Sequence, residues 1–217
     1  MQDKFKNTCL HLLLKKNKNS LEILKLLVEN KINLNLKDWN LNTPIHVACS
    51  QTKKDILFFM IEKKSNPYLL NKKKENILHI LCSNANLNVD ILEYVMSLNS
   101  EINQADEKKE TPLHKLTTQN LNLDLIAYLI NYKADLNLNF PENPLSYALK
   151  NTKCTIEVIE FLVKSKSQVD KIFFSSLTEK NKDLMKQFNN QNISPKEYFE
   201  KHESKCVLNY KKKKFYS

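Results

Sequence analysis

The chain has 217 residues, 41% of them hydrophobic, and a formal net charge of +10 at pH 7. This length allows one large domain, two small domains or an array of repeats, and the apolar residues can supply a sizeable core. The sequence contains no glycine, and all 34 of its basic residues are lysines. Such usage is typical of a coding sequence biased towards A and T, so part of the lysine excess reflects genome composition.

The apolar segments and the cysteines indicate the compartment in which the protein is found. No apolar run approaches the roughly 18 residues of a membrane span, and residues 1–20 lack the cleavage site of a signal peptide. The odd number of cysteines argues against a framework of disulfide bonds. The cysteines form no CxxC pair and have no histidine at zinc-finger spacing, which argues against a zinc site. They are Cys9, Cys49, Cys82, Cys154 and Cys206. We therefore expect an intracellular protein, cytoplasmic or nuclear.

One short phrase recurs along the chain. Its copies start 35, 33, 35 and 32 residues apart: TCLHLLL (8–14), TPIHVAC (43–49), NILHILC (76–82), TPLHKLT (111–117) and NPLSYAL (143–149). A second shared segment follows each copy, at 20–35, 54–69, 88–103, 123–137 and 155–170. This register indicates five repeats of about 34 residues.

Periodicity assigns each repeat two helices. The first begins, in the TPLH phrase, with Thr as N-cap and proline at the first helical position. The second has a broad apolar face, as in LEILKLLV (21–28). One such pair cannot bury both of its faces, so neighbouring pairs must stack into an all-α solenoid of helix-turn-helix units.

These residues resemble the ankyrin-repeat family. The marks are TPIH (43–46), TPLH (111–114), weaker forms at 8–11 and 76–79, and EILKLLVENKINLN (22–35). The resemblance implies short hairpin-like loops between repeats, with approximate repeat boundaries of 1–37, 38–70, 71–105, 106–138 and 139–170. We expect a degenerate sixth repeat or cap at 171–191, and a short helix with a Lys-rich tail at 192–217.

The absence of glycine departs from the family pattern at two kinds of turn. The hairpin-tip glycine is replaced by Lys6, Leu41, Lys74, Lys109 and Pro141, and the glycine after the second helix by Lys31, Lys64, Asn99, Lys133 and Lys166. A left-handed conformation costs Leu or Lys on the order of 1 kcal/mol, and proline cannot adopt it. The turns are therefore either strained or built with another geometry.

The candidate chemical groups do not indicate an enzyme, a metal site or a cofactor. Four histidines share one repeat position, but equivalent side chains about 10 Å apart are too distant to share one ion: His11, His46, His79 and His114. The family resemblance implies that they form hydrogen bonds across the connecting loops. His202 and Cys206 have helical spacing, but two residues alone make a poor metal or nucleophile site.

The C-terminal segment NYKKKKFYS contains Lys211, Lys212, Lys213 and Lys214. It is interpreted as a solvated tail, with a nuclear import signal or an electrostatic tether to anionic lipid or nucleic acid as alternatives. The absence of arginine argues against specific nucleic-acid recognition, because the bidentate contacts to guanine are lost.

The family resemblance implies binding of another protein through hairpin tips and inner-helix ends. The candidate residues are Trp39, Asn40, Asn42, Lys72, Lys73, Glu75, Glu107, Lys108, Glu110, Phe140, Ser50, Gln51, Thr118 and Gln119. Trp39 is the sole tryptophan and is either an interface anchor or packed on a neighbouring hairpin. We expect a non-catalytic adaptor or scaffold, with a weak preference for an acidic partner. The alternatives are a lysine-driven binder of anionic surfaces and a regulatory or targeting subunit of an enzyme.

Overall fold

The computed structural model describes residues 2–16, 20–51, 53–98, 100–139, 142–151 and 153–165. These ranges contain ten α-helices and no strand: α1 (Cys9–Lys15), α2 (Ser20–Glu29), α3 (Pro44–Gln51), α4 (Lys54–Glu62), α5 (Ile77–Cys82), α6 (Val89–Met96), α7 (Pro112–Gln119), α8 (Leu123–Asn131), α9 (Pro144–Lys150) and α10 (Ile156–Lys164). The chain divides into two compact units, an N-terminal unit of residues 1–112 and a C-terminal unit of residues 113–217.

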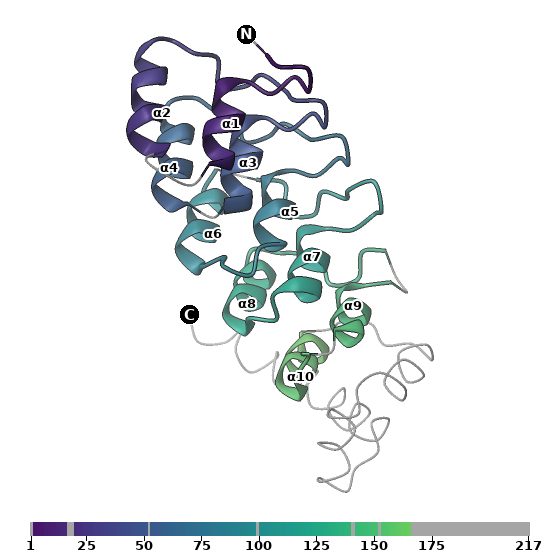
Figure 1. The fold of residues 1–217 in the computed structure, drawn as a ribbon. Helices are drawn as coiled ribbons and strands as arrows, with labels where there is room; N and C mark the ends of the chain where they lie inside the picture. The colour runs from purple at the N-terminus through teal and green to yellow at the C-terminus, as the bar shows by residue number, and fades with distance from the viewer. Residues whose placement is uncertain are drawn as a thin grey trace, which may run out of the picture. The chain divides into compact units, whose positions relative to one another are not determined.

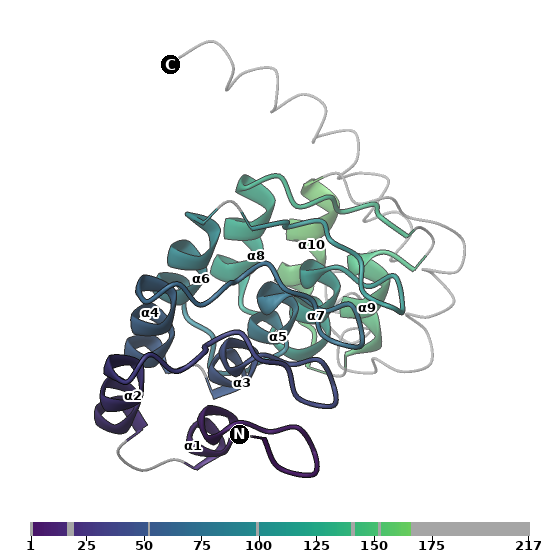
Figure 2. The same cartoon turned by 90° about the horizontal axis from the view of Figure 1, so that it is seen from above.

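The N-terminal unit has two rows of helices. The first helices of successive pairs contact one another, α1 with α3 and α3 with α5, and α2 contacts α4 in the second row (Figures 1 and 2). The third residue of the recurring phrase is fully buried in each copy here: Leu10, Ile45 and Leu78. The phrase therefore recurs because each copy supplies the same layer of a continuous core.

The C-terminal unit repeats this construction with α7–α10. Leu113 and Leu145 occupy the same phrase position and are fully buried, and α9 packs on α10. Leu125, Ile159 and Leu162 from the second helices complete the apolar interior.

Asparagine and threonine side chains begin many of the helices. Thr8 and Asn76 each accept the backbone N–H of the histidine three residues later, at 3.4 and 3.1 Å. Asn88, Asn122 and Asn143 cap α6, α8 and α9 in the same way. Each such cap satisfies an N–H group that the helix itself leaves without a partner.

The glycine-free turns retain the left-handed conformation. Positive φ angles occur at four hairpin-tip positions and at three positions after second helices: Lys6, Leu41, Lys74 and Lys109, and Lys31, Lys64 and Lys133. Of the two expected possibilities, the strained turn is therefore the one observed at these seven positions.

Several predicted features lie outside the described residues. These are the turn residues Asn99, Pro141 and Lys166, the cap at 171–191, the helix and tail at 192–217, His202, Cys206 and Lys211–Lys214. At the fifth hairpin the described residue with positive φ is Asn139, at 63°, and asparagine tolerates this conformation better than most residues.

Candidate protein-binding surface

Each of the first four hairpin tips is a five-residue turn, and residues 38–42 form the second of them. The N–H of Leu41 donates to the carbonyl of Asp38, and the N–H of Asp38 donates to the carbonyl of Asn42, both at 2.9 Å. This is a type I turn followed by a left-handed residue in a bulge. The Asp38 carboxylate closes the turn from inside by accepting the N–H groups of Asn40 and Asn42 at 2.8 and 2.9 Å.

The same side-chain support recurs in the other three tips. Asp3 accepts the N–H groups of Phe5 and Asn7, and Asn71 and Asp106 accept the corresponding pairs at 2.8–3.0 Å. Hydrogen bonding to Asn7 and to the backbone lowers the pKa of the Asp3 carboxyl below its ordinary value. Sequence reasoning missed this role, although the four residues each lie five positions before the recurring phrase.

Adjacent tips of the N-terminal unit are joined through their backbones. Trp39 donates its N–H to the Phe5 carbonyl at 3.1 Å, and Lys72 donates to the Asn40 carbonyl at 2.8 Å. Glu107 continues the series by donating to the Lys73 carbonyl at 2.8 Å. The four tips therefore form one hydrogen-bonded edge.

The repeated histidines connect the inner helices to these tips. The N–H of Thr8 donates to Nδ1 of His11 at 3.2 Å, so the proton of the neutral ring is on Nε2, which donates to the Asn42 carbonyl at 2.9 Å. His79 makes the equivalent bond to the Glu110 carbonyl at 3.0 Å. These bonds confirm the cross-loop role that the family resemblance implied.

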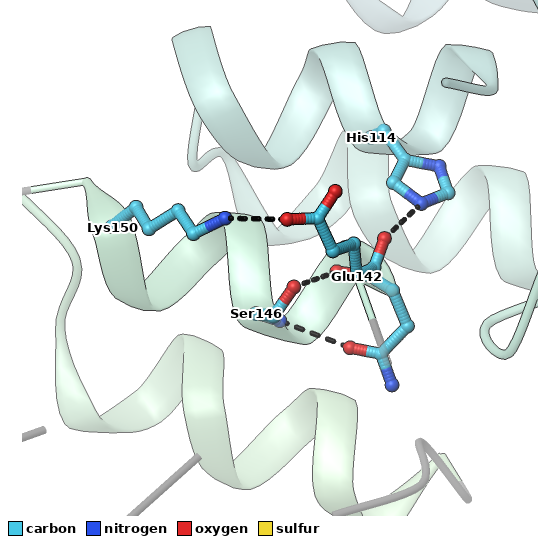
Figure 3. Close-up of polar contacts among 5 residues, drawn as sticks. His114, Glu142, Ser146 and Lys150 are labelled. Atoms are coloured by element: carbon cyan, nitrogen blue, oxygen red, sulfur yellow. Dashed lines mark hydrogen bonds and ion pairs between the residues drawn. The ribbon is translucent and has the colours of Figure 1, made fainter. Parts of the chain in front are cut away.

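The C-terminal unit contains the same connection. His114 bonds through Nε2 to the Glu142 carbonyl at 3.0 Å, and the Glu142 carboxylate lies 3.5 Å from the Lys150 ammonium (Figure 3). The side chain of Asn151 donates to the Thr118 carbonyl at 2.6 Å, which links the ends of α7 and α9.

His46 differs from these three histidines. Its Nδ1 accepts the Thr43 N–H at 3.2 Å, and the carbonyls of Leu69 and Glu75 lie near the ring, but its buried Nε2 has no hydrogen-bond partner. Burial lowers the pKa of His46 to about 4, so the ring is neutral at physiological pH. The Glu75 carbonyl, which corresponds to the acceptors of the other three histidines, therefore contacts this ring without a well-formed hydrogen bond from Nε2.

An open hollow of about 640 Å³ lies within the N-terminal unit. Tips and inner helices contribute together to its lining, which is mostly amide and charged: Lys15, Asp38, Asn40, Asn42, His46, Val47, Ser50, Gln51, Asn71, Lys72, Lys73, Glu75, Ile80 and Glu107. Eight candidate residues from the sequence are thus brought together, namely Asn40, Asn42, Ser50, Gln51, Lys72, Lys73, Glu75 and Glu107. Asp38, Val47, Asn71 and Ile80 were not predicted.

The remaining candidates lie elsewhere. Trp39 is 61% exposed beside the hollow-lining Asn40 but does not line the hollow itself, and neither do Lys108 and Glu110. Thr118 and Gln119 belong to α7 in the C-terminal unit, where the Thr118 hydroxyl donates to the His114 carbonyl at 2.7 Å. Phe140 lies outside the described residues.

The described residues hold no group of three or more His, Cys, Asp or Glu side chains that could bind a metal ion. Cys49 and Cys82 are buried, and burial raises the pKa of each thiol, so neither is a ready thiolate nucleophile. Over the same part of the chain, no helix is long and apolar enough to cross a membrane.

Comparison with known proteins assigns the family. A search of curated proteins finds no match. A family model described as ankyrin repeats (3 copies) matches residues 1–71 and 78–172, and the expected fold class, an all-α ankyrin-repeat solenoid, is confirmed. Ankyrin repeats are generally protein–protein interaction modules and are typically non-catalytic. Because the match covers well over half of its length, the chain belongs to the ankyrin-repeat family.

Proposed function

We propose that the chain is a non-catalytic adaptor or scaffold that binds another protein through the hollow of the N-terminal unit. One observation carries this proposal: residues from three inner helices and three neighbouring tips line a single hollow. The backbone and histidine hydrogen bonds hold much of this lining in place before a partner arrives. A preorganised surface loses little conformational entropy on binding.

The chemistry of the hollow suits a polypeptide segment. Small-molecule pockets are lined mostly by hydrophobic residues and enclose their ligand, whereas this hollow is open and Val47 and Ile80 are the hydrophobic residues of its lining. Asn40 and Gln51 each offer amide donors and an acceptor, which match the peptide groups of an extended segment. Lysine and glutamate side chains around them supply charges of both signs.

The test is affinity purification from the native cell with three versions of the full chain. Ser50→Arg with Gln51→Arg puts two bulky cations into the hollow without touching the buried core. The matched control, Ile23→Arg with Leu26→Arg, adds the same charge at exposed positions of α2. Both variants are first checked for native helix content by circular dichroism.

We expect the wild-type chain and the α2 variant to retain the same proteins, and the hollow variant to lose them. Equal retention by all three versions would contradict binding through the hollow. Loss with both variants would contradict a specific role for the hollow. Stronger retention of anionic partners by both arginine variants would instead support the anionic-surface alternative, because each variant adds two positive charges.

A further inference from the structure

Three large apolar side chains stand exposed on the first two tips. Trp39 is 61% exposed, Phe5 50% and Leu41 44%. The Phe5 and Trp39 rings meet edge to face, with centroids 6.1 Å apart and planes at 84°. The backbone bond from Trp39 to the Phe5 carbonyl holds the two residues side by side. An aromatic pair fixed in this way is a preorganised apolar anchor rather than two independent surface rings.

Lysines surround this apolar group on the first and third tips. The five exposed ammonium groups belong to Lys4, Lys6, Lys72, Lys73 and Lys74. Asp3 is the one exposed acidic residue among residues 2–7, 38–42 and 71–75, since Asp38 is buried and Glu75 is half-buried with its carboxylate bonded to Asn71. We call the three apolar residues and five lysines the basic aromatic edge.

The excess charge on this edge is not neutralised internally. Within the described residues, Lys6, Lys72, Lys73 and Lys74 form no ion pair, and Lys4 lies over the Phe5 ring, 5.1 Å from its centroid. The fourth tip shows a different pattern, because Glu107 and Glu110 offset Lys108 and Lys109. Complementary charge on a partner is therefore favoured at the first three tips in particular.

We propose that the basic aromatic edge binds an acidic segment of a protein partner, and that one large apolar side chain of this segment packs on Trp39 and Phe5. This inference rests on the proposed function and names the partner's chemistry. Trp39 and Phe5 exclude water from the contact, and carboxylates on either side of the apolar residue pair with the lysines.

A polypeptide fits this region better than a phosphate polymer does. The hollow shares Lys72 and Lys73 with the edge but also presents the exposed Glu107 and the half-buried Glu75. These carboxylates repel a continuous run of phosphates, whereas a peptide can place amide or basic groups against them. Leu41 adds aliphatic surface, which packs on a side chain and not on a sugar–phosphate backbone.

In the experiment, a displayed library of short random peptides is selected for binding to the immobilised full chain at physiological salt. The affinity of the enriched peptides for the chain is then measured. We expect these peptides to be net acidic and to share a large apolar residue. Trp39→Ala should weaken them about 30-fold, as expected for an interface hot spot. Lys72→Glu with Lys73→Glu should abolish binding, and raised salt should weaken it.

Matched controls separate these effects from folding and from charge in general. Leu26→Ala removes an equally exposed apolar side chain from α2, and Lys25→Glu with Lys64→Glu makes the same charge change at exposed positions away from the tips. Both controls should bind the enriched peptides within about twofold of the wild-type chain, because exposed positions outside an interface contribute little.

The outcomes separate this inference from the proposed function. Enriched peptides that are neutral or basic, or that bind Trp39→Ala normally, overturn the inference. If the peptides that overturn the inference do not bind the Ser50→Arg and Gln51→Arg variant, the hollow remains the binding surface and the proposed function stands. Equimolar phosphatidylcholine–phosphatidylserine vesicles and oligothymidine serve as competitors, and tighter binding to either, independent of Trp39, also overturns the inference.

Discussion

Hydrogen bonds to Asp38 stabilise the turn in which Leu41 adopts a strained conformation. The Leu41 N–H donates to the Asp38 carbonyl at 2.9 Å, while Leu41 itself has a φ of 55°, in the left-handed region. That conformation costs a residue with a Cβ about 1–2 kcal/mol. The buried Asp38 carboxylate offsets it by accepting two further N–H groups of the same turn.

Asp38→Ala should destabilise the N-terminal unit by about 1–3 kcal/mol, because two N–H groups lose their acceptor in a partly buried site. The informative control is Asp38→Asn, since Asn71 already performs this role in the third tip with the same pair of bonds. Urea unfolding, monitored by circular dichroism, measures the free energy of unfolding of both variants. Equal stability of the alanine and asparagine variants would show that the side chain does not support the turn.

Lys109→Gly should stabilise the N-terminal unit by on the order of 1 kcal/mol, because glycine adopts the φ of 64° at this position without steric strain. Lys108→Gly is its matched control. Residue 108 lies in the same tip but outside the left-handed region, so glycine there adds only unfolded-state freedom and should destabilise slightly. A lower melting temperature for Lys109→Gly would contradict the strained-turn interpretation.

Acidification should destabilise the chain through His46. Its pKa is about 4 when folded and near 6.5 in the unfolded chain, so the unfolded state binds the proton first as the pH falls. The free energy of unfolding should therefore decline from pH 6.5 to pH 4, by at most about 3 kcal/mol from this residue. Burial also lowers the pKa of His11, which acts in the same direction.

His46→Gln isolates the contribution of this residue. The variant should be less stable than the wild-type chain at pH 7.5 but should lose less stability on acidification. Parallel pH profiles of unfolding free energy for the two proteins would refute the assignment.

The repeat architecture was predictable because the core imposes strict spacing on the sequence. Leu10, Ile45 and Leu78 recur at one register, and each fills the same buried layer. The histidine role was predictable only through the family resemblance, since spacing alone shows a shared position and not its hydrogen-bond partner. The turn geometry could not be decided from sequence, because the choice between strain and remodelling depends on hydrogen bonds within each tip.

The candidate surface was predictable in part. Tip residues such as Asn40 and Lys73 follow from the repeat register, and the structure brings them to one hollow. Asp38 and Asn71 were missed because their shared position, five residues before the recurring phrase, does not by itself reveal the two backbone N–H groups that each accepts. The unpartnered Nε2 of His46 is an exception to the repeat pattern that no periodicity reveals.

Trp39 provides the most direct test of protein binding at the tips, because it is the chain's sole tryptophan and is 61% exposed. In the free protein its emission should resemble that of tryptophan in water, with strong quenching by acrylamide. Titration with a partner protein or with an enriched acidic peptide should shift the emission to shorter wavelength and protect the indole from quenching. Binding established by calorimetry with no change in either signal would contradict partner binding at Trp39.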